Sequence, residues 1–454
     1  MCMSDLAGTL EMTAGICPRL IEEFMYRVAR RPVSKLVALL PAADPPPTFE
    51  ELERLVSRAC LPVTLRQNAS GSRICAQLQE PSGARRRYDV EVDLTDFLPK
   101  YVELASPLGG SFDPALASQF FLSVSCKLGH DVLDSLHAQL RLLAALAPNA
   151  VAMLDVNAFH AKTGDWMRDA ASASVPPAPT SFFSVHSVFD DDKKMWLHTH
   201  GLHRMGSIEL DILGARRREA PALTELINNV ARFFIDCGVP LPNTRFHAGN
   251  GLPLVWLPWE AALRHVDGSP GGAADRDAGH SGERGILFAP AKESPERLET
   301  PRCYVRMIEA DPIFYVSSAE TERMQRLAVE RLPSFLALQS RFAKKRKWNF
   351  HVKLGFPADG DGDGHRYCHE HGGGAAEHLW FDVHKATAKN VDGTLLNQPY
   401  RITGLREGQR GTFDLRLLTD WAIESPRGRY TPESVLQLER GLADDRVSAR
   451  PLLH

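Results

Sequence analysis

The chain has 454 residues, of which 44% are hydrophobic and 24% charged, and its formal net charge is -3. Such a length exceeds one ordinary hydrophobic core and predicts two domains. The near-neutral charge argues against nucleic acid and against an anionic membrane surface as the main partner.

The cysteines and the hydropathy of the chain indicate in which compartment the protein is expected. The eight cysteines include no Cys-x-x-Cys pair, which argues against a thiolate zinc knuckle and a secreted disulfide framework. The first thirty residues hold no apolar run of signal-peptide length, and no window approaches the roughly 18 apolar residues of a membrane-spanning helix. We therefore expect a cytoplasmic protein with no membrane partner.

The N-terminal half alternates short strands with two-faced helices. After a helical extension over residues 1–30 and a buried strand at Lys35–Leu40, Thr48 and Glu51 form the capping-box pattern of a helix start. Further strands are expected at residues 62–66, 73–78, 88–94, 120–125, 150–156, 182–189, 195–200 and 208–213, and helices at 131–147 and 222–236. This alternation predicts an α+β domain over residues 31–266.

The composition changes at residues 267–285, which are mostly Gly, Ala, Asp, Ser and Arg and predict a flexible linker. A second α+β domain is expected over residues 286–430, followed by a tail at 431–454. Its expected elements are strands at 304–309, 348–356, 379–386, 391–396 and 411–417 and one long helix at 318–342. The predicted fold class is thus α+β, with two domains whose mixed or antiparallel sheets are packed by helices.

Short motifs in both halves carry family resemblances. The C-terminal motifs are Glu377-His378-Leu379-Trp380, Gly393-x-Leu395-x-Asn397-x-Pro399, Leu405-x-x-Gly408 and Asp420-Trp421. In this order they resemble the signature of the bacterial domain of unknown function 2314. The segment Trp196–Gly206 followed by Glu209–Ile212 resembles a block of the bacterial domain of unknown function 4026.

Neither family has an established activity, so the resemblance implies a bacterial protein but no particular reaction. Domains similar to the C-terminal one occur among immunity proteins of bacterial toxin systems. The resemblance therefore implies another protein as the partner.

One candidate metal site is the pair His198 and His200. Residues two apart on a strand point to the same face, so both imidazoles could bind one ion, with His203 or Asp155 as a third ligand. The alternative is structural, with polar rings that cap a strand and Gly201 present for backbone reasons. A lone His-x-His match does not decide between them.

A second candidate metal site is the segment Asp359-Gly-Asp361-Gly-Asp363-Gly364, with Glu370 six residues further on. The spacing fits a calcium loop. The flanking residues do not predict helices, however, so the alternative is a Gly/Asp insertion between strands. A rival ligand set consists of His365, Cys368, His369 and His371.

The C-terminal motif residues are candidates for a binding surface or for local structure. Asn397 is expected to shape a turn, and Trp380 and Trp421 to fill the core. Three charged or polar residues, Glu377, His378 and Asp420, either bond locally or, together with Asn397, line a recognition surface.

The common motifs of hydrolases, kinases, zinc proteases and dinucleotide enzymes are absent from the sequence. The leading hypothesis is therefore a non-enzymatic binding or regulatory protein, immunity-like, with no cofactor. The alternative is a metal-dependent hydrolase that uses His198 and His200 with a divalent metal as cofactor.

Overall fold

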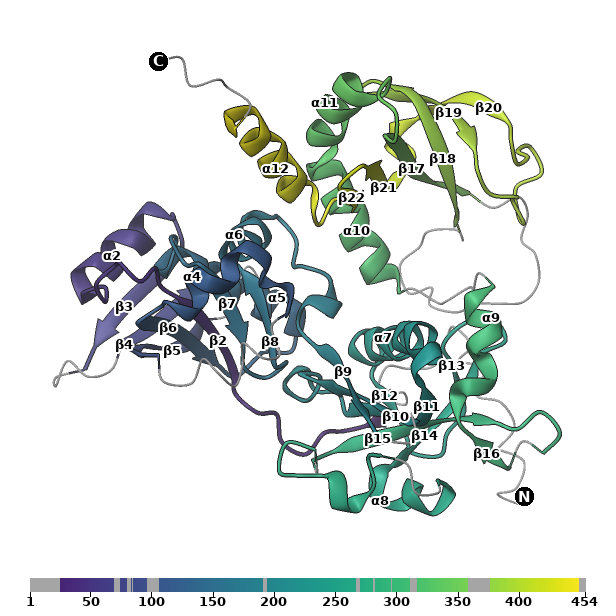
Figure 1. Ribbon diagram of the computed structural model, residues 1–454, viewed down its shortest axis with the longest axis horizontal. Helices are drawn as coiled ribbons and strands as arrows, with labels where there is room; N and C mark the ends of the chain where they lie inside the picture. Colours follow the sequence, from purple (N-terminus) through teal and green to yellow (C-terminus); the bar gives the residue numbers. More distant parts are fainter. Residues whose placement is uncertain are drawn as a thin grey trace. The chain divides into compact units, whose positions relative to one another are not determined.

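The computed structural model describes residues 25–68, 74–79, 83, 85–95, 106–190, 194–266, 270–280, 282–294, 296–310, 317–357 and 376–448. The chain forms two compact units, the first Met25–Val316 and the second containing Ser317–His454 (Figure 1). Helices accompany mixed and antiparallel sheets, which confirms the predicted α+β class. The division between the units differs from the predicted linker, because residues 267–285 belong to the first unit.

The first unit contains an antiparallel seven-stranded sheet of order β3-β4-β5-β6-β2-β7-β8. Its strands are β2 (Ser34–Leu39), β3 (Val63–Gln67), β4 (Ile74–Gln79), β5 (Arg85–Leu94), β6 (Phe120–Cys126), β7 (Ala152–Asp155) and β8 (His160–Thr163). Helices α2 (Phe49–Arg58), α4 (Phe112–Leu116), α5 (Val132–Leu146) and α6 (Gly164–Ser172) accompany it. Strand β2 is buried on both faces, since Leu36 and Ala38 enter one hydrophobic cluster and Val37 and Leu39 another.

The second sheet of this unit is mixed, with the order β13-β14-β15-β11-β10-β9 and β16 paired to β15. Its strands are β9 (Ser184–Phe189), β10 (Lys194–His200), β11 (Glu209–Arg216), β13 (Phe246–His247), β14 (Pro253–Pro258), β15 (Arg284–Pro290) and β16 (Leu298–Glu299). Helix α7 (Ala220–Cys237) packs on one face with Leu223, Leu226 and Ile227. The other face carries Trp196 and Ile286 in a separate cluster and, beside them, a row of polar side chains.

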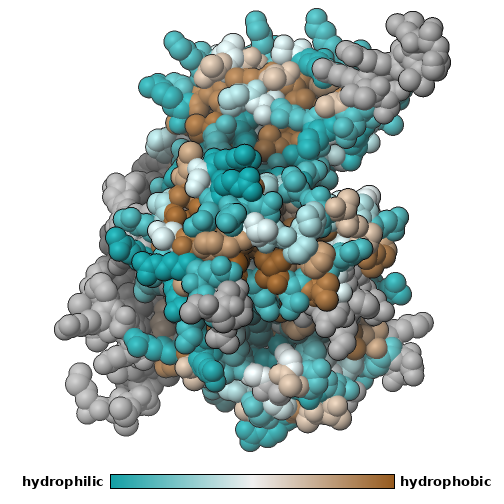
Figure 2. Space-filling view, turned by 90° about the vertical axis from the view of Figure 1, so that its left-hand side faces the viewer, coloured by the Kyte–Doolittle hydropathy of each residue, from teal (hydrophilic) through white to brown (hydrophobic). Residues whose placement is uncertain are grey.

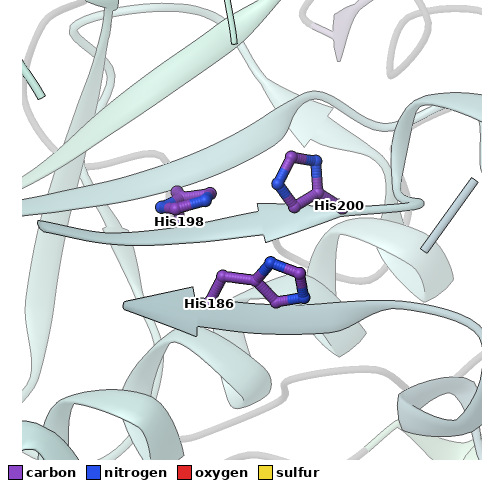
Figure 3. Close-up of side chains that lie close together, drawn as sticks. All are labelled: His186, His198 and His200. Carbon is purple, nitrogen blue, oxygen red and sulfur yellow. The ribbon is translucent and has the colours of Figure 1, made fainter. Parts of the chain in front are cut away.

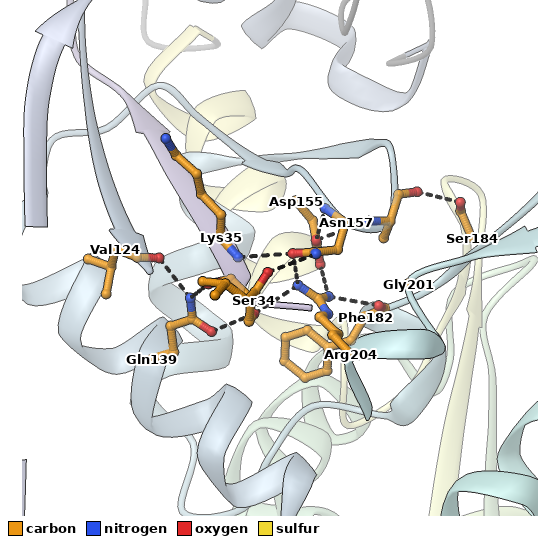
Figure 4. A network of polar contacts seen from close by, with 12 residues as sticks. Ser34, Lys35, Val124, Gln139, Asp155, Asn157, Phe182, Ser184, Gly201 and Arg204 are labelled. Carbon is orange, nitrogen blue, oxygen red and sulfur yellow. Dashed lines mark hydrogen bonds and ion pairs between the residues drawn. The ribbon is translucent and has the colours of Figure 1, made fainter. Parts of the chain in front are cut away.

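A buried polar network joins the two sheets (Figure 4). Arg204, which follows β10, donates to the Asp155 carboxylate at the end of β7, to Ser34 Oγ at 3.0 Å and to the Phe182 carbonyl at 2.8 Å. Gln139 of α5 donates to the Ser34 carbonyl at 3.1 Å. The two sheets therefore share one polar anchor as well as one hydrophobic core.

The second unit is built on an antiparallel six-stranded sheet of order β20-β19-β18-β17-β21-β22. Its strands are β17 (Asn349–Pro357), β18 (Ala376–Ala386), β19 (Asn390–Leu395), β20 (Arg410–Asp414), β21 (Leu418–Ser425) and β22 (Gly428–Tyr430), and its helices are α10 (Ser318–Glu330), α11 (Leu332–Phe342) and α12 (Val435–Ser448). Phe335, Val352, Phe381 and Trp421 form the centre of its core.

Several expected elements differ from the observed ones. Residues 301–309 are helical (a 3₁₀ turn at Pro301–Tyr304 and α9, Val305–Glu309), because Thr300 caps the segment and Pro301 starts it. The expected helix 318–342 breaks at Arg331 ahead of Pro333, giving α10 and α11. The expected tail 431–454 contains α12, which buries Val435 and Leu438 in the core.

The N-terminal extension was expected to be helical over residues 1–30. Residues 1–24 lie outside the described part of the chain. Met25–Tyr26 forms β1, which pairs with β12 (Val239–Pro240) instead of continuing a helix.

The described residues contain no helix that is long and apolar enough to cross a membrane. Figure 2 shows one face of the molecule, on which hydrophobic side chains stand in small groups among predominantly hydrophilic ones.

Candidate metal centre

Strand β10 places its two histidines on one face of the mixed sheet. Trp196, His198 and His200 alternate with Leu197 and Thr199, so the two imidazoles lie on the same side. His186 on β9 stands directly opposite His198 in the antiparallel register. Figure 3 shows all three rings projecting from the same side of these strands.

The three imidazoles lie close enough to share one ion. One ring nitrogen from each lies within 4.8 Å of the others. The ring centres are 5.7 Å apart for His186 and His198, 4.9 Å for His186 and His200, and 5.0 Å for His198 and His200. His198 and His200 are buried, and His186 is half-buried.

Burial keeps these rings in the form that binds metal. It lowers the pKa of both His198 and His200 to about 2, and the nearby Arg284 guanidinium adds to the effect. Burial also lowers the pKa of His186. A neutral imidazole offers a free lone pair, so no proton needs to be displaced before an ion binds at neutral pH.

One nitrogen of the cluster has no protein partner. His198 Nδ1 is buried, and no hydrogen-bond partner for it exists within the described part of the chain. A buried polar atom without a partner is unfavourable and calls for an explanation such as an ion or an ordered water. This atom is the clearest local sign of a ligand.

Polar groups beside the cluster fix the strands that carry it. The Asp211 carboxylate on β11 accepts hydrogen bonds from Arg284 at 3.0 Å, and Arg276 lies 2.8 Å away as an ion-pair partner. Glu209 accepts from Thr199 Oγ1 at 2.7 Å and from the Gly201 amide at 2.9 Å. These contacts hold the end of β10 in place.

Gly201 is at this position for backbone reasons. Its φ is +106°, and a Cβ would come within 2.7 Å of the Phe182 carbonyl. The tight turn after His200 therefore requires glycine, as the structural alternative expected.

The structure does not bring the other expected ligands to the cluster. His203 Nε2 lies 3.0 Å from Glu283 Oε2, away from the three rings, and Asp155 is paired with Arg204. The loop residues Asp359, Asp361, Asp363 and Glu370, and the rival set at 365–371, lie outside the described residues. His186 was missed from the sequence, because its placement depends on the pairing of β9 with β10.

Comparisons with known families fit this division of the chain. Residues 85–177 and 185–288 match the N-terminal and C-terminal parts of the family described as protein of unknown function (DUF4026). Residues 336–446 match DUF2314, described as an uncharacterized protein conserved in bacteria. We call residues 85–288 the DUF4026 region and residues 336–446 the DUF2314 domain, after the families that they match. Both resemblances seen in the sequence are confirmed, while no curated protein and no solved structure matches.

The histidine cluster lies in the C-terminal part of the DUF4026 region.

The motif residues of the DUF2314 domain make local contacts. Glu377 accepts from the amides of Tyr400 and Arg401, both at 2.8 Å. Asn397 accepts from the Trp380 amide at 2.9 Å.

Of the other two binding-surface candidates, His378 lies on β18 and Asp420 on β21, and β17 separates these two strands. His378 Nδ1 lies 3.1 Å from Thr419 Oγ1. Asp420 accepts from the Trp421 amide at 2.8 Å. Burial raises the pKa of Asp420 to about 6 and lowers that of Lys353, which faces it.

Proposed function

We propose that the DUF4026 region binds one transition-metal ion of the zinc class through His186, His198 and His200. The observation that carries this proposal is the set of three neutral, mutually close imidazoles, one of which has a buried nitrogen without a protein partner. Imidazole suits Zn²⁺ and its neighbours, whereas Ca²⁺ and Mg²⁺ prefer oxygen. The three histidines lie on the paired strands β9 and β10, which also supports the proposal. Rigid strands hold ligand side chains in a fixed geometry before an ion binds.

Elemental analysis of the full chain, purified without an affinity tag, tests the proposal. Wild-type protein should carry about one transition-metal ion per chain, as a three-histidine site requires. His186→Ala and His198→Ala should each lose it. His130→Ala is the matched control, because that side chain is fully exposed and lies in another sheet's loop. Wild-type protein that neither retains nor takes up zinc after dialysis against it would refute the proposal.

We also propose that the DUF2314 domain binds another protein. It is supported by Tyr400, whose side chain is 84% exposed although Glu377 holds its backbone amide. An aromatic side chain on a fixed loop is typical of an interface anchor.

A binding measurement tests this role. The purified partner is the product of a toxin-type gene that lies next to the gene of this protein. Tyr400→Ala should weaken its binding by about tenfold or more, the usual effect of removing an interface anchor. Leu116→Ala, a substitution of another exposed apolar residue in the other unit, is the control. Saturable binding that is unchanged by Tyr400→Ala would exclude this surface.

A further inference from the structure

A fourth histidine lies over the cluster. His280 belongs to the segment that composition predicts as a linker, and its ring centre is 4.9 Å from that of His198 and 5.0 Å from that of His200. It also lies 5.1 Å from the ring of Trp196, the residue that precedes His198 on the same face. The segment therefore covers the histidine face.

Arg276 fastens this segment to the sheet. Its guanidinium carbon lies 5.0 Å from the ring centre of Trp196 and 4.8 Å from that of Trp259, and its side chain is 1% exposed. It pairs with Asp211 at 2.8 Å and donates to the His280 carbonyl at 3.2 Å. The backbone of His280 is thus tied to the strand next to the histidines.

The His280 ring has a fixed orientation. Its Nδ1 lies 2.7 Å from Asp277 Oδ1, and since a carboxylate only accepts, Nδ1 carries the proton. The lone pair is then on Nε2. Histidines that bind metal commonly donate their second nitrogen to a carboxylate in this way.

We propose that His280 is the fourth ligand of the ion and that Asp277 orients it, so that the ion closes the 270–280 segment over the sheet. This inference rests on the proposed function above. Five of the six distances between the four ring centres lie between 4.9 and 5.7 Å. Four imidazoles bound tetrahedrally at zinc–nitrogen distances of about 2.1 Å have centres roughly 5 Å apart.

A four-histidine site has a chemical consequence. Catalytic zinc keeps one position open for water, and structural zinc has four protein ligands. With His280 bound, no position is left for a nucleophilic water. The ion then holds the segment in place and does not hydrolyse a substrate, which separates this proposal from the hydrolase alternative.

Cobalt substitution of the full chain tests the fourth ligand. Co²⁺ replaces Zn²⁺, and its visible absorption is strong when four-coordinate and weaker when water adds to the site. Wild-type protein should show the strong spectrum and no change with azide. His280→Ala should admit water and azide, and should weaken zinc binding by more than the 10–100-fold expected for losing an orienting partner.

A second variant tests the inference even if His280→Ala does not fold. The Asp277 side chain is 75% exposed, so Asp277→Asn should fold normally and weaken zinc binding about 10–100-fold. His130→Ala is again the control. If wild-type protein binds zinc but His280→Ala and Asp277→Asn keep its spectrum and affinity, this inference is overturned and the three-histidine site stands. If wild-type protein binds no zinc, both fail.

Discussion

Asp420 of the DUF2314 domain shows how one mostly buried carboxyl contributes to the pH dependence of its fold. Burial raises its pKa to about 6 from an ordinary 3.8, although the Trp421 amide, Lys353 and Arg429 favour the charged form; Glu433 opposes it. The folded state therefore binds this proton more tightly than the unfolded state. Its contribution to stability is largest below about pH 4 and is lost as the pH rises through 6.

Asp420→Asn should stabilise the domain at pH 7 by up to about 3 kcal/mol, the free energy that corresponds to the difference between the two pKa values. Asparagine keeps an oxygen for the Trp421 amide. Urea unfolding at pH 4 and pH 7, followed by tryptophan fluorescence, measures the effect, which should vanish at pH 4. Asp414→Asn is the control, since its pKa is lowered by Arg416 and it titrates below this range. An equal gain at both pH values would contradict the argument.

The two tryptophans of the DUF2314 motifs differ in a way that the sequence does not reveal. Trp421 is completely buried, donates to the Ala328 carbonyl at 2.9 Å and packs on Phe335. Trp380 is half-buried, with the Lys353 ammonium 5.7 Å from its ring. The sequence motifs include both tryptophans. They do not show which face of the sheet α10 and α11 cover, because that depends on how the helices pack.

Trp421→Ala should lower the free energy of unfolding by about 3–5 kcal/mol, the usual cost of removing a buried large aromatic. Trp380→Ala should cost clearly less, because part of its ring is already in water. Denaturant unfolding of both variants in parallel checks the difference. Equal losses would mean that the two rings are equally buried.

At the scale of the element, periodicity predicted strands β2 to β7 and β9 to β11 well, while composition did not reveal the buried contacts of residues 270–280. The Thr48–Glu51 capping box is present as predicted, because it depends on four adjacent residues. Arg276 is buried because Asp211, Trp196 and Trp259 surround it. Such partners, distant in sequence, cannot be read from a Gly- and Asp-rich composition.

The same partners predict the proteolytic behaviour of this segment. The bonds after Arg276 and Arg284 should resist trypsin in the native protein, because both side chains are about 1% exposed and paired with Asp211. Asp211→Asn should make Arg276 cleavable. Mass spectrometry of the first fragments decides. An early cut after Arg276 in wild-type protein would restore the linker interpretation.

At the scale of the molecule, the two parts of the DUF4026 region behave as one unit. Asp155 lies in the N-terminal part and Arg204 in the C-terminal part, and both side chains are fully buried. The sequence predicted one domain across both parts, but it did not predict the pair, because Asp155 was considered as a metal ligand.

Arg204→Met should lower the free energy of unfolding by about 3–5 kcal/mol, because it leaves the Asp155 carboxylate buried without a counter-charge. The double variant Arg204→Met/Asp155→Asn should recover part of this loss. Thermal unfolding of the wild-type protein, of Arg204→Met, of Asp155→Asn and of the double variant tests the coupling. A double variant that is additive with its single variants would show that the pair is not coupled.

The position of β15 has a consequence for how the chain is made. This strand lies between β14 and β11, pairing antiparallel with the first and parallel with the second, yet it is the last of the three to leave the ribosome. Until residue 290 is available, the inner edges of β11 and β14 have no strand between them. Open edges of this kind favour association with other chains. Nascent chains that stall before Arg284 should therefore depend most on chaperones, and the mixed sheet should form late, in a single cooperative step.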